Sequence, residues 1–60
     1  MRVEISVLEP GFDAETYVVS NERECHDQVD LFAYRHAVDT REEVRVGCIL
    51  AHPIPEGVPA

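Results

Sequence analysis

The length of the chain, 60 residues, is the feature that most limits what it can fold into. A domain of this size buries only about 60% of the surface that its unfolded chain exposes, so its hydrophobic core is thin. One sheet covered by one or two helices is close to the largest structure that such a core supports. A pocket of roughly 300 Å³ or more for a small molecule requires a larger interior. We therefore expect a single, non-enzymatic domain without a cofactor.

Two short strands are predicted near the start of the chain. Residues 2–8, RVEISVL, alternate between polar and apolar, with every second side chain from Val3 onward apolar. Pro10 and Gly11 then indicate a turn. Residues 15–19, ETYVV, are rich in β-branched and aromatic types, which favour a second strand. The six residues between the two segments predict a hairpin with a longer loop.

A helix is predicted over residues 20–37. Asn21 is the expected N-cap, with Ser20 as an alternative, and Glu24 at the third helical position completes a capping box. At 100° per residue, one stripe of side chains faces the sheet. This stripe consists of Cys25, Val29, Phe32, Ala33 and His36. The polar sequence DTREE after Val38 predicts the end of the helix.

The last strand is predicted over residues 43–52, EVRVGCILAH. As one continuous strand it alternates between the two faces of the sheet. The side chains expected to point inward are Val44, Val46, Cys48 and Leu50, and those expected to point outward are Arg45, Gly47, Ile49 and Ala51. Prolines lack the amide donor that a strand needs, so residues 53–60 are expected to form a flexible, proline-rich tail.

The expected fold is α+β with the order ββαβ. A right-handed crossover through the helix puts the third strand beside the first. Residues 1–52 then form a three-stranded antiparallel sheet of order 2-1-3, with the helix packed on one face. The other face stays open and is expected to hold Thr16, Val18, Ile49 and Ala51 beside Arg2, Glu4 and Arg45. These residues are either a second contact surface or simply solvated, because single exposed apolar side chains are ordinary.

The charge of the chain excludes several classes of partner. Twelve Asp and Glu residues stand against five Arg and no Lys, which gives a formal net charge of −7. A nucleic-acid-binding protein needs a basic patch, which this chain lacks, and anionic membranes should repel it. No apolar run approaches the roughly 20 residues of a membrane span, and the N-terminus does not resemble a signal peptide. We expect a protein of the bacterial cytoplasm, encoded by the bacterium or by a phage in it.

Four residues with metal-ligand chemistry do not form a recognisable metal site. Cys25 and His26 are adjacent on the predicted helix, so their side chains diverge by about 100°. Cys48 and His52 are about 13 Å apart along the predicted strand. Both cysteines are expected to face the interface between sheet and helix, where a disulfide between them is geometrically conceivable. In a reducing cytoplasm the expected state is two free thiols in contact with each other in the core. A Cys–His catalytic pair is not expected either, since Cys25 and His36 lie three helical turns apart.

The outward side of the predicted helix combines acids with apolar side chains. Glu24, Asp27 and Leu31 follow the spacing i, i+3, i+7, and so do Asp27, Asp30 and Tyr34. A solvated helix would normally carry Lys or Arg between its acids. Two readings stay open. One is a partner-binding surface in which the acids steer and Leu31 and Tyr34 anchor; the other is a solvated helix with Tyr34 lying along a neighbouring loop.

Further acids occur outside the predicted helix. They are Glu9, Asp13 and Glu15 around the first loop, and Asp39, Glu42 and Glu43 after the helix. If these acids align with the helical row, the protein offers carboxylates to a surface built for phosphates, which is nucleic-acid mimicry.

In size, acidity and layout the chain resembles the small phage-encoded inhibitors of bacterial defence, such as the anti-CRISPR proteins. These proteins share no sequence motif, so the resemblance assigns no residue. It implies that the partner is a basic, nucleic-acid-binding protein, such as a DNA-binding subunit of a CRISPR effector. We expect the protein itself to be a monomer that does not contact nucleic acid. The alternative is a small regulatory or antitoxin-like subunit that dimerises or binds a partner through the open face of its sheet.

Overall fold

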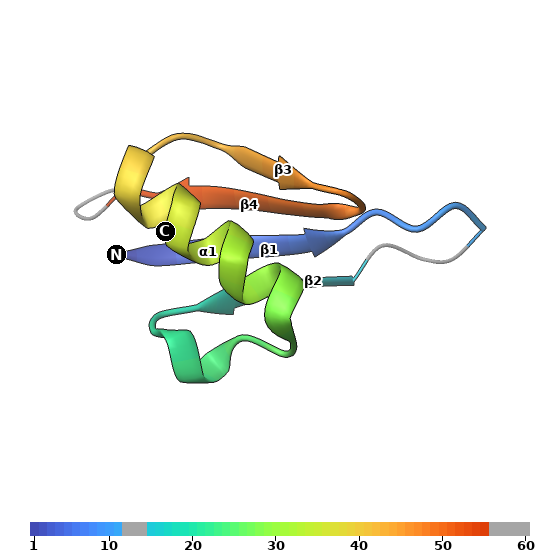
Figure 1. The fold of residues 1–60 in the computed structure, drawn as a ribbon, viewed down its shortest axis with the longest axis horizontal. Coiled ribbons are helices and arrows are strands. Elements are labelled where there is room, and N and C mark those ends of the chain that lie inside the picture. Colours follow the sequence, from blue (N-terminus) through green and yellow to red (C-terminus); the bar gives the residue numbers. More distant parts are fainter. Residues whose placement is uncertain (12–14, 56–60) are drawn as a thin grey trace.

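The computed structural model describes residues 1–11 and 15–55, and it consists of two layers (Figure 1). A four-stranded antiparallel sheet of order β2-β1-β4-β3 forms one layer, and the helix α1 covers one of its faces. In chain order the elements are β1 (Arg2–Val7), β2 (Glu15–Val19), the 3₁₀ helix η1 (Glu22–Glu24), α1 (Gln28–Thr40), β3 (Val44–Val46) and β4 (Ile49–Ile54). The α+β class and the antiparallel sheet are confirmed, but the sheet has four strands and not three.

The fourth strand arises because the predicted strand 43–52 is a hairpin. Gly47 and Cys48 form its turn, and Val46 pairs with Ile49 directly across it. Gly47 has a φ of 58°, a left-handed conformation that the tight turns of hairpins require and that glycine adopts without steric cost. The second half of the segment, β4, pairs with β1 as the last strand was expected to do.

The hairpin also reverses which side chains of residues 49–52 face the core and which face the open side of the sheet. Because Val46 and Ile49 are cross-strand partners, they lie on the same face of the sheet. Ile49 and Ala51 are therefore buried beneath α1, and their predicted outward orientation is wrong. Leu50, predicted inward, lies on the open face, since it pairs with Ser6 and Arg45. An alternation pattern does not reveal a two-residue turn within it, and this turn shifts the pattern by one position.

Strand β4 extends further than predicted. It continues through Pro53 and Ile54, which pair with Val3 and Arg2 of β1. The boundary expected after residue 52 is therefore wrong. The proline is accommodated because β3 pairs with β4 only as far as Ala51, so β4 has an open edge beside Pro53. The remainder of the expected tail, residues 56–60, lies outside the described residues.

The predicted helix 20–37 is two separate helices. Asn21 caps the short η1, where its side chain accepts a hydrogen bond from the backbone N–H of Arg23. The α-helix begins six residues later, with Asp27 as its N-cap. The side chain of Asp27 accepts from the N–H groups of Val29 and Asp30, and the side chain of Asp30 accepts from the N–H of Asp27. This second capping box, and not the one expected at Asn21, fixes the start of α1.

The later start is accompanied by a different buried face of the helix. The α1 residues that point into the core are Asp30, Ala33, Tyr34 and Ala37. Of the predicted stripe only Ala33 is buried, since Val29 and Phe32 are 44% and 53% exposed and His36 is exposed. Cys25 precedes the helix and packs half-buried against the core. The small side chains of Ala33 and Ala37 allow α1 to approach the sheet closely.

The strands supply the rest of the core. Val3, Ile5 and Val19 are fully buried, and Ile49 and Ala51 complete the layer on the sheet side. The alternation of β1 is confirmed, because Val3 and Ile5 are buried and Val7 packs against the cluster.

Candidate interaction surface

The five residues predicted to bind a partner do not form one surface. Glu24, in η1, and Asp27, at the start of α1, are exposed, and Leu31 is half-buried. Asp30 is only 1% exposed and Tyr34 only 8%, so their predicted outward orientation is wrong. The reason is that α1 packs on the sheet with a different side from the predicted one. The side that contains Asp30 and Tyr34 faces the core, and the side that contains Val29 and Phe32 faces solvent. The acidic helical row therefore does not exist.

Asp30 is instead a buried carboxylate that joins the helix to the sheet. It accepts hydrogen bonds from the backbone N–H groups of His26 and Asp27, at 2.8 and 2.7 Å, and from the hydroxyl of Tyr17 in β2. A buried carboxylate is costly unless its oxygens are hydrogen-bonded, and these three donors meet that requirement. Asp30 is thus a structural residue.

Two aromatic residues complete this connection between β2 and α1. The ring of Tyr17 stacks on that of His26, with centroids 3.9 Å apart and planes inclined by 5°. Tyr34 donates a hydrogen bond of 3.4 Å to the backbone carbonyl of Ser20. Burial raises the pKa of the Tyr34 hydroxyl. Neither tyrosine is therefore available as an exposed anchor.

A salt bridge ties η1 to the outer side of α1. The guanidinium of Arg35 donates to both carboxylate oxygens of Glu22, at 3.2 and 3.0 Å. The hydrogen bond and the positive charge of Arg35 lower the pKa of Glu22, and Glu22 in turn raises the pKa of Arg35. Because both side chains are more than half exposed, solvent screens the pair and its effect on stability is small.

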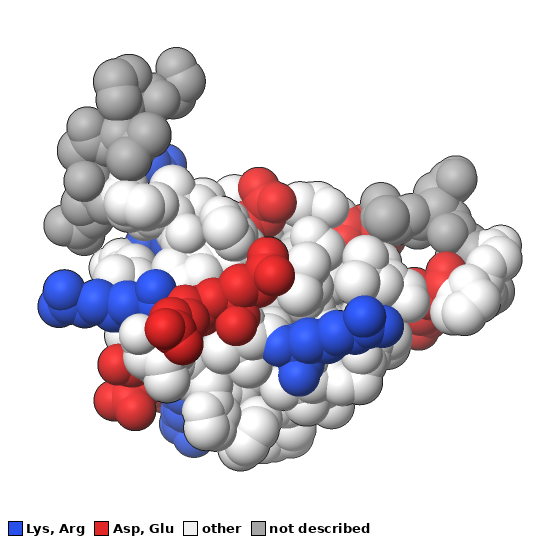
Figure 2. Space-filling view, turned by 90° about the horizontal axis from the view of Figure 1, so that it is seen from above, with Lys and Arg blue, Asp and Glu red and all other residues white. Residues whose placement is uncertain are grey.

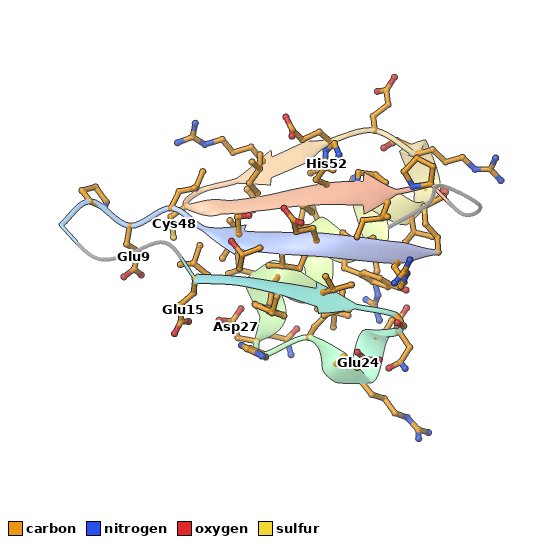
Figure 3. The ribbon with its side chains drawn as sticks, turned by 180° about the vertical axis from the view of Figure 1, so that it is seen from behind. Glu9, Glu15, Glu24, Asp27, Cys48 and His52 are labelled. Carbon is orange, nitrogen blue, oxygen red and sulfur yellow. The ribbon has the colours of Figure 1, made fainter. Side chains whose placement is uncertain are left out.

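The exposed acids are distributed unevenly around the sheet. Glu15, Asp27 and Glu24 lie along the side of the molecule that β2 borders, and Glu9 lies on the connection that projects beyond the ends of β1 and β2 (Figure 3). We call these four residues the β2-side acids. Among the described residues, none of the four has an arginine or histidine within ion-pair distance. The nearby η1 contributes one further cation, Arg23, which is exposed and follows the paired Glu22.

The opposite side of the sheet has mixed charge. Over the edge formed by β3, acidic and basic side chains are interleaved (Figure 2). Arg41, Glu42, Glu43 and Arg45 follow one another here along the chain, and Glu43 also lies 3.3 Å from the Nδ1 atom of His52. An excess of carboxylates therefore marks the β2 side and not the β3 side.

The exposed side of α1 carries an aromatic residue, Phe32, that was expected in the core. Phe32 is 53% exposed, and its ring lies 4.5 Å from that of His36. Val29, one turn earlier, is also exposed. The sequence does contain a signal for this: Asp27 and Asp30 have the three-residue spacing of a capping box, and a helix that starts there can have a different buried face.

The open face of the sheet differs from the predicted one in composition. Val18, 44% exposed, lies there as expected, together with Thr16. Leu50 and Ile54 take the places assigned to Ile49 and Ala51, and both are half-buried. Arg2, Glu4, Arg45 and His52 share this face, so its charges nearly balance.

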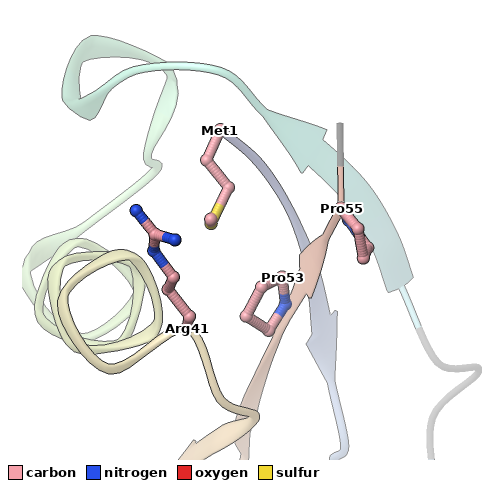
Figure 4. A pocket seen from close by; sticks show the side chains of 4 residues that line it. All are labelled: Met1, Arg41, Pro53 and Pro55. Carbon is pink, nitrogen blue, oxygen red and sulfur yellow. The ribbon is translucent and has the colours of Figure 1, made fainter. Parts of the chain in front are cut away.

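A depression in the described surface lies near the N-terminus and the end of β4. It has a volume of about 560 Å³ and is lined by Met1, Arg41, Pro53 and Pro55 (Figure 4). The volume falls within the range of small-molecule pockets, but the depression is open at the surface and not enclosed by the thin core, which was the kind of pocket that the chain length was expected to rule out. The described lining has one charged side chain, Arg41, and no acid–base or nucleophilic pair, so it gives no basis for assigning a reaction.

The residues with metal or thiol chemistry are dispersed. Within residues 1–11 and 15–55, no three His, Cys, Asp or Glu side chains are grouped so as to hold a metal ion. Both cysteines are free. Cys48 lies in the β3–β4 turn, so the predicted contact of two cysteines in the core is not formed. Burial, followed by the charge of Glu22, raises the pKa of the Cys25 thiol, which disfavours the nucleophilic thiolate.

Comparison with known proteins assigns no relative: no family model, no curated protein and no solved structure matches the chain. No helix in the described part of the chain has the length and apolar character needed to cross a membrane.

Proposed function

We propose that this protein is a non-enzymatic, acidic binding protein that occupies a positively charged, nucleic-acid-binding site on another protein. The β2-side acids stand in for the phosphates that such a site normally binds. The resemblance to small phage-encoded inhibitors suggests the partner class, a DNA-binding subunit of a bacterial defence complex such as a CRISPR effector.

The observation that carries the proposal is the uneven distribution of charge. Among the described residues, the β2-side acids have no cationic partner within ion-pair distance, whereas acidic and basic side chains are interleaved over the β3 edge. A local excess of carboxylates on a molecule of net charge −7 attracts a basic surface and raises the rate of association.

Apolar contacts must add to this attraction, because exposed charges alone give steering more than affinity. Val29 and Phe32 follow Asp27 along the first turns of α1, and both are exposed. Phe32 takes the anchoring role that was expected of Tyr34, since aromatic side chains supply much of the binding energy in many interfaces.

The test compares two triple variants of equal charge. The β2-side variant replaces three acids by Gln: Glu9, Glu15 and Glu24. The control variant replaces three other acids by their amides: Asp39, Glu42 and Glu43. Each variant changes the formal net charge from −7 to −4 (−7 + 3). Partners are captured from a bacterial lysate on the unaltered protein at low salt and identified. Displacement of DNA from a captured DNA-binding protein is then measured for all three forms.

The proposal predicts that only the β2-side variant loses activity. Its inhibition of DNA binding should weaken by about tenfold or more, and binding of the unaltered protein should weaken as salt shortens the range of the interaction. Equal loss in both variants would show that overall charge is sufficient. Tight binding that is insensitive to sodium chloride, or a captured protein with no affinity for nucleic acid, would refute charge mimicry.

The open face of the sheet favours a second candidate, a regulatory subunit that pairs with a copy of itself. Val18, Leu50 and Ile54 are apolar, and the charges around them nearly balance, so two copies meet here with little repulsion. Sedimentation at increasing protein concentration tests this. A dimer that Leu50→Asp dissociates, but Phe32→Asp does not, would support it, and a monomer at all concentrations would exclude it.

A further inference from the structure

The two edge strands of the sheet differ in how well they are protected against pairing. Proteins block exposed edges with short strands, prolines or basic side chains. β3 has three residues, and the middle one is the exposed Arg45. β2 has five residues, Glu15–Val19, with no proline, lysine or arginine among them. β2 is therefore the unprotected edge.

The outer edge of β2 has unused backbone hydrogen-bonding groups. Within the described part of the chain, the backbone hydrogen bonds of Glu15–Val19 go to β1 alone. Successive residues of a strand direct their N–H and C=O groups to alternate sides, so about half of these groups point away from the sheet. Within the described residues no backbone hydrogen bond occupies this outer edge, and the side chains of Glu15, Thr16 and Val18 are exposed, so a further strand can pair here.

The charge around this edge selects between possible occupants. Glu15 is part of β2, and Asp27 and Glu24 lie beside it on the same side of the molecule (Figure 3). A second copy would bring the same acids to the same edge, and like charges in close apposition disfavour pairing. A segment with lysine or arginine side chains places cations near these carboxylates instead.

We propose that the outer edge of β2 binds an extended, basic segment of the partner protein as a fifth strand of the sheet. Main-chain hydrogen bonds give such strand addition its affinity, and alternate side chains give it specificity. Val18, on the open face, contacts an apolar side chain of the segment. The basic character of the segment rests on the function proposed above, whereas the pairing rests on the edge itself.

The test uses a synthetic octapeptide of alternating valine and lysine, with its ends blocked. A strand can pair through either of its edges, and N-methylation of residues i and i+2 blocks one edge only. N-methylation of two adjacent central residues blocks both edges while leaving charge and methyl count the same. Binding of all three peptides is followed by NMR titration of the protein at low salt.

Strand addition predicts that the peptide methylated at i and i+2 still binds and that the one methylated at adjacent residues loses at least tenfold in affinity. The largest changes in chemical shift on binding should occur at the backbone amides of residues 15–19. Val18→Lys should weaken binding more than His52→Lys, which adds the same charge on the same face but on β4.

Equal binding of the two methylated peptides, or no binding of the unmodified peptide, would overturn the inference. So would shifts centred elsewhere, or a dimer in solution held through β2. None of these results bears on DNA displacement by the two triple variants, so strand addition can fail while charge mimicry stands. Conversely, if the peptide pairs with β2 but no partner binds in a salt-sensitive way, strand addition stands and the proposed function is refuted.

Discussion

At the scale of single residues, Asp30 is the side chain whose role changed most between sequence and structure. As a member of the outward helical row with Asp27 and Tyr34, Asp30 was expected to face solvent, as most aspartates do. Its burial is possible because Tyr17, 13 residues earlier, donates to it from β2 while two backbone N–H groups donate from the turn before α1. One carboxylate thus caps the helix and attaches it to the sheet.

We expect Asp30→Asn to destabilise the fold by about 1–3 kcal/mol, because the amide NH₂ faces donors and leaves a buried group unsatisfied. Tyr17→Phe, which keeps the stacked ring but removes the hydroxyl donor, should cost about 1.5–3 kcal/mol. Urea unfolding followed by circular dichroism measures both. Asp39→Asn, at an exposed position of the same helix, is the control and should change stability by less than about 0.5 kcal/mol. Equal effects at positions 30 and 39 would contradict the structural role of Asp30.

At the scale of elements, the start of α1 and its buried face were the least predictable features. Only Asn21, with Ser20 as the alternative, was expected to cap a helix, whereas the structure has two N-caps, Asn21 for η1 and Asp27 for α1. The predicted stripe and the observed one both have helical spacing and differ only in which residues lie inward. Phe32 and Tyr34, two positions apart, consequently exchange environments.

This exchange leads to a direct comparison between two aromatic residues on one helix. Tyr34→Ala should destabilise the protein by about 3 kcal/mol or more, because it leaves a cavity in the core. Phe32→Ala should change stability by less than about 1 kcal/mol, since its ring is more than half exposed. Thermal or urea unfolding of the two variants decides the matter. A larger loss for Phe32→Ala would mean that the sequence-predicted face of the helix is the buried one.

At the scale of the whole molecule, a small core supports a large net charge. The radius of gyration is 11.0 Å, whereas the Debye length in 0.01 M salt is about 30 Å. At this salt concentration the carboxylates, which outnumber the arginines, therefore repel one another across the whole molecule. The attractive pairs Arg35–Glu22 and His52–Glu43 are exposed and contribute little. Repulsion should therefore exceed attraction at low ionic strength.

We expect the unfolding temperature to rise when sodium chloride is increased from about 0.01 to 1 M, which shortens the Debye length to about 3 Å. Both triple variants of net charge −4 should show a smaller rise, because they carry less charge to screen. Scanning calorimetry measures the effect. A midpoint that falls with salt would show that the exposed ion pairs outweigh the repulsion.

The sequence by itself determined the features that depend on neighbouring residues or on totals. These are the alternation of β1, the short second strand, a helix in the middle of the chain and the strongly acidic surface. It also placed the last strand beside the first, because compact chains of this order have few ways to connect.

Only the tertiary structure decided which side of each element is buried. A two-residue turn at Gly47 and Cys48 divided one predicted strand and reversed the faces of its second half. The buried side of α1 depended on a hydroxyl from β2 that makes the burial of a carboxylate acceptable. Periodicity within a segment gives the spacing of a buried face, whereas its identity is set by partners that lie far away in the chain.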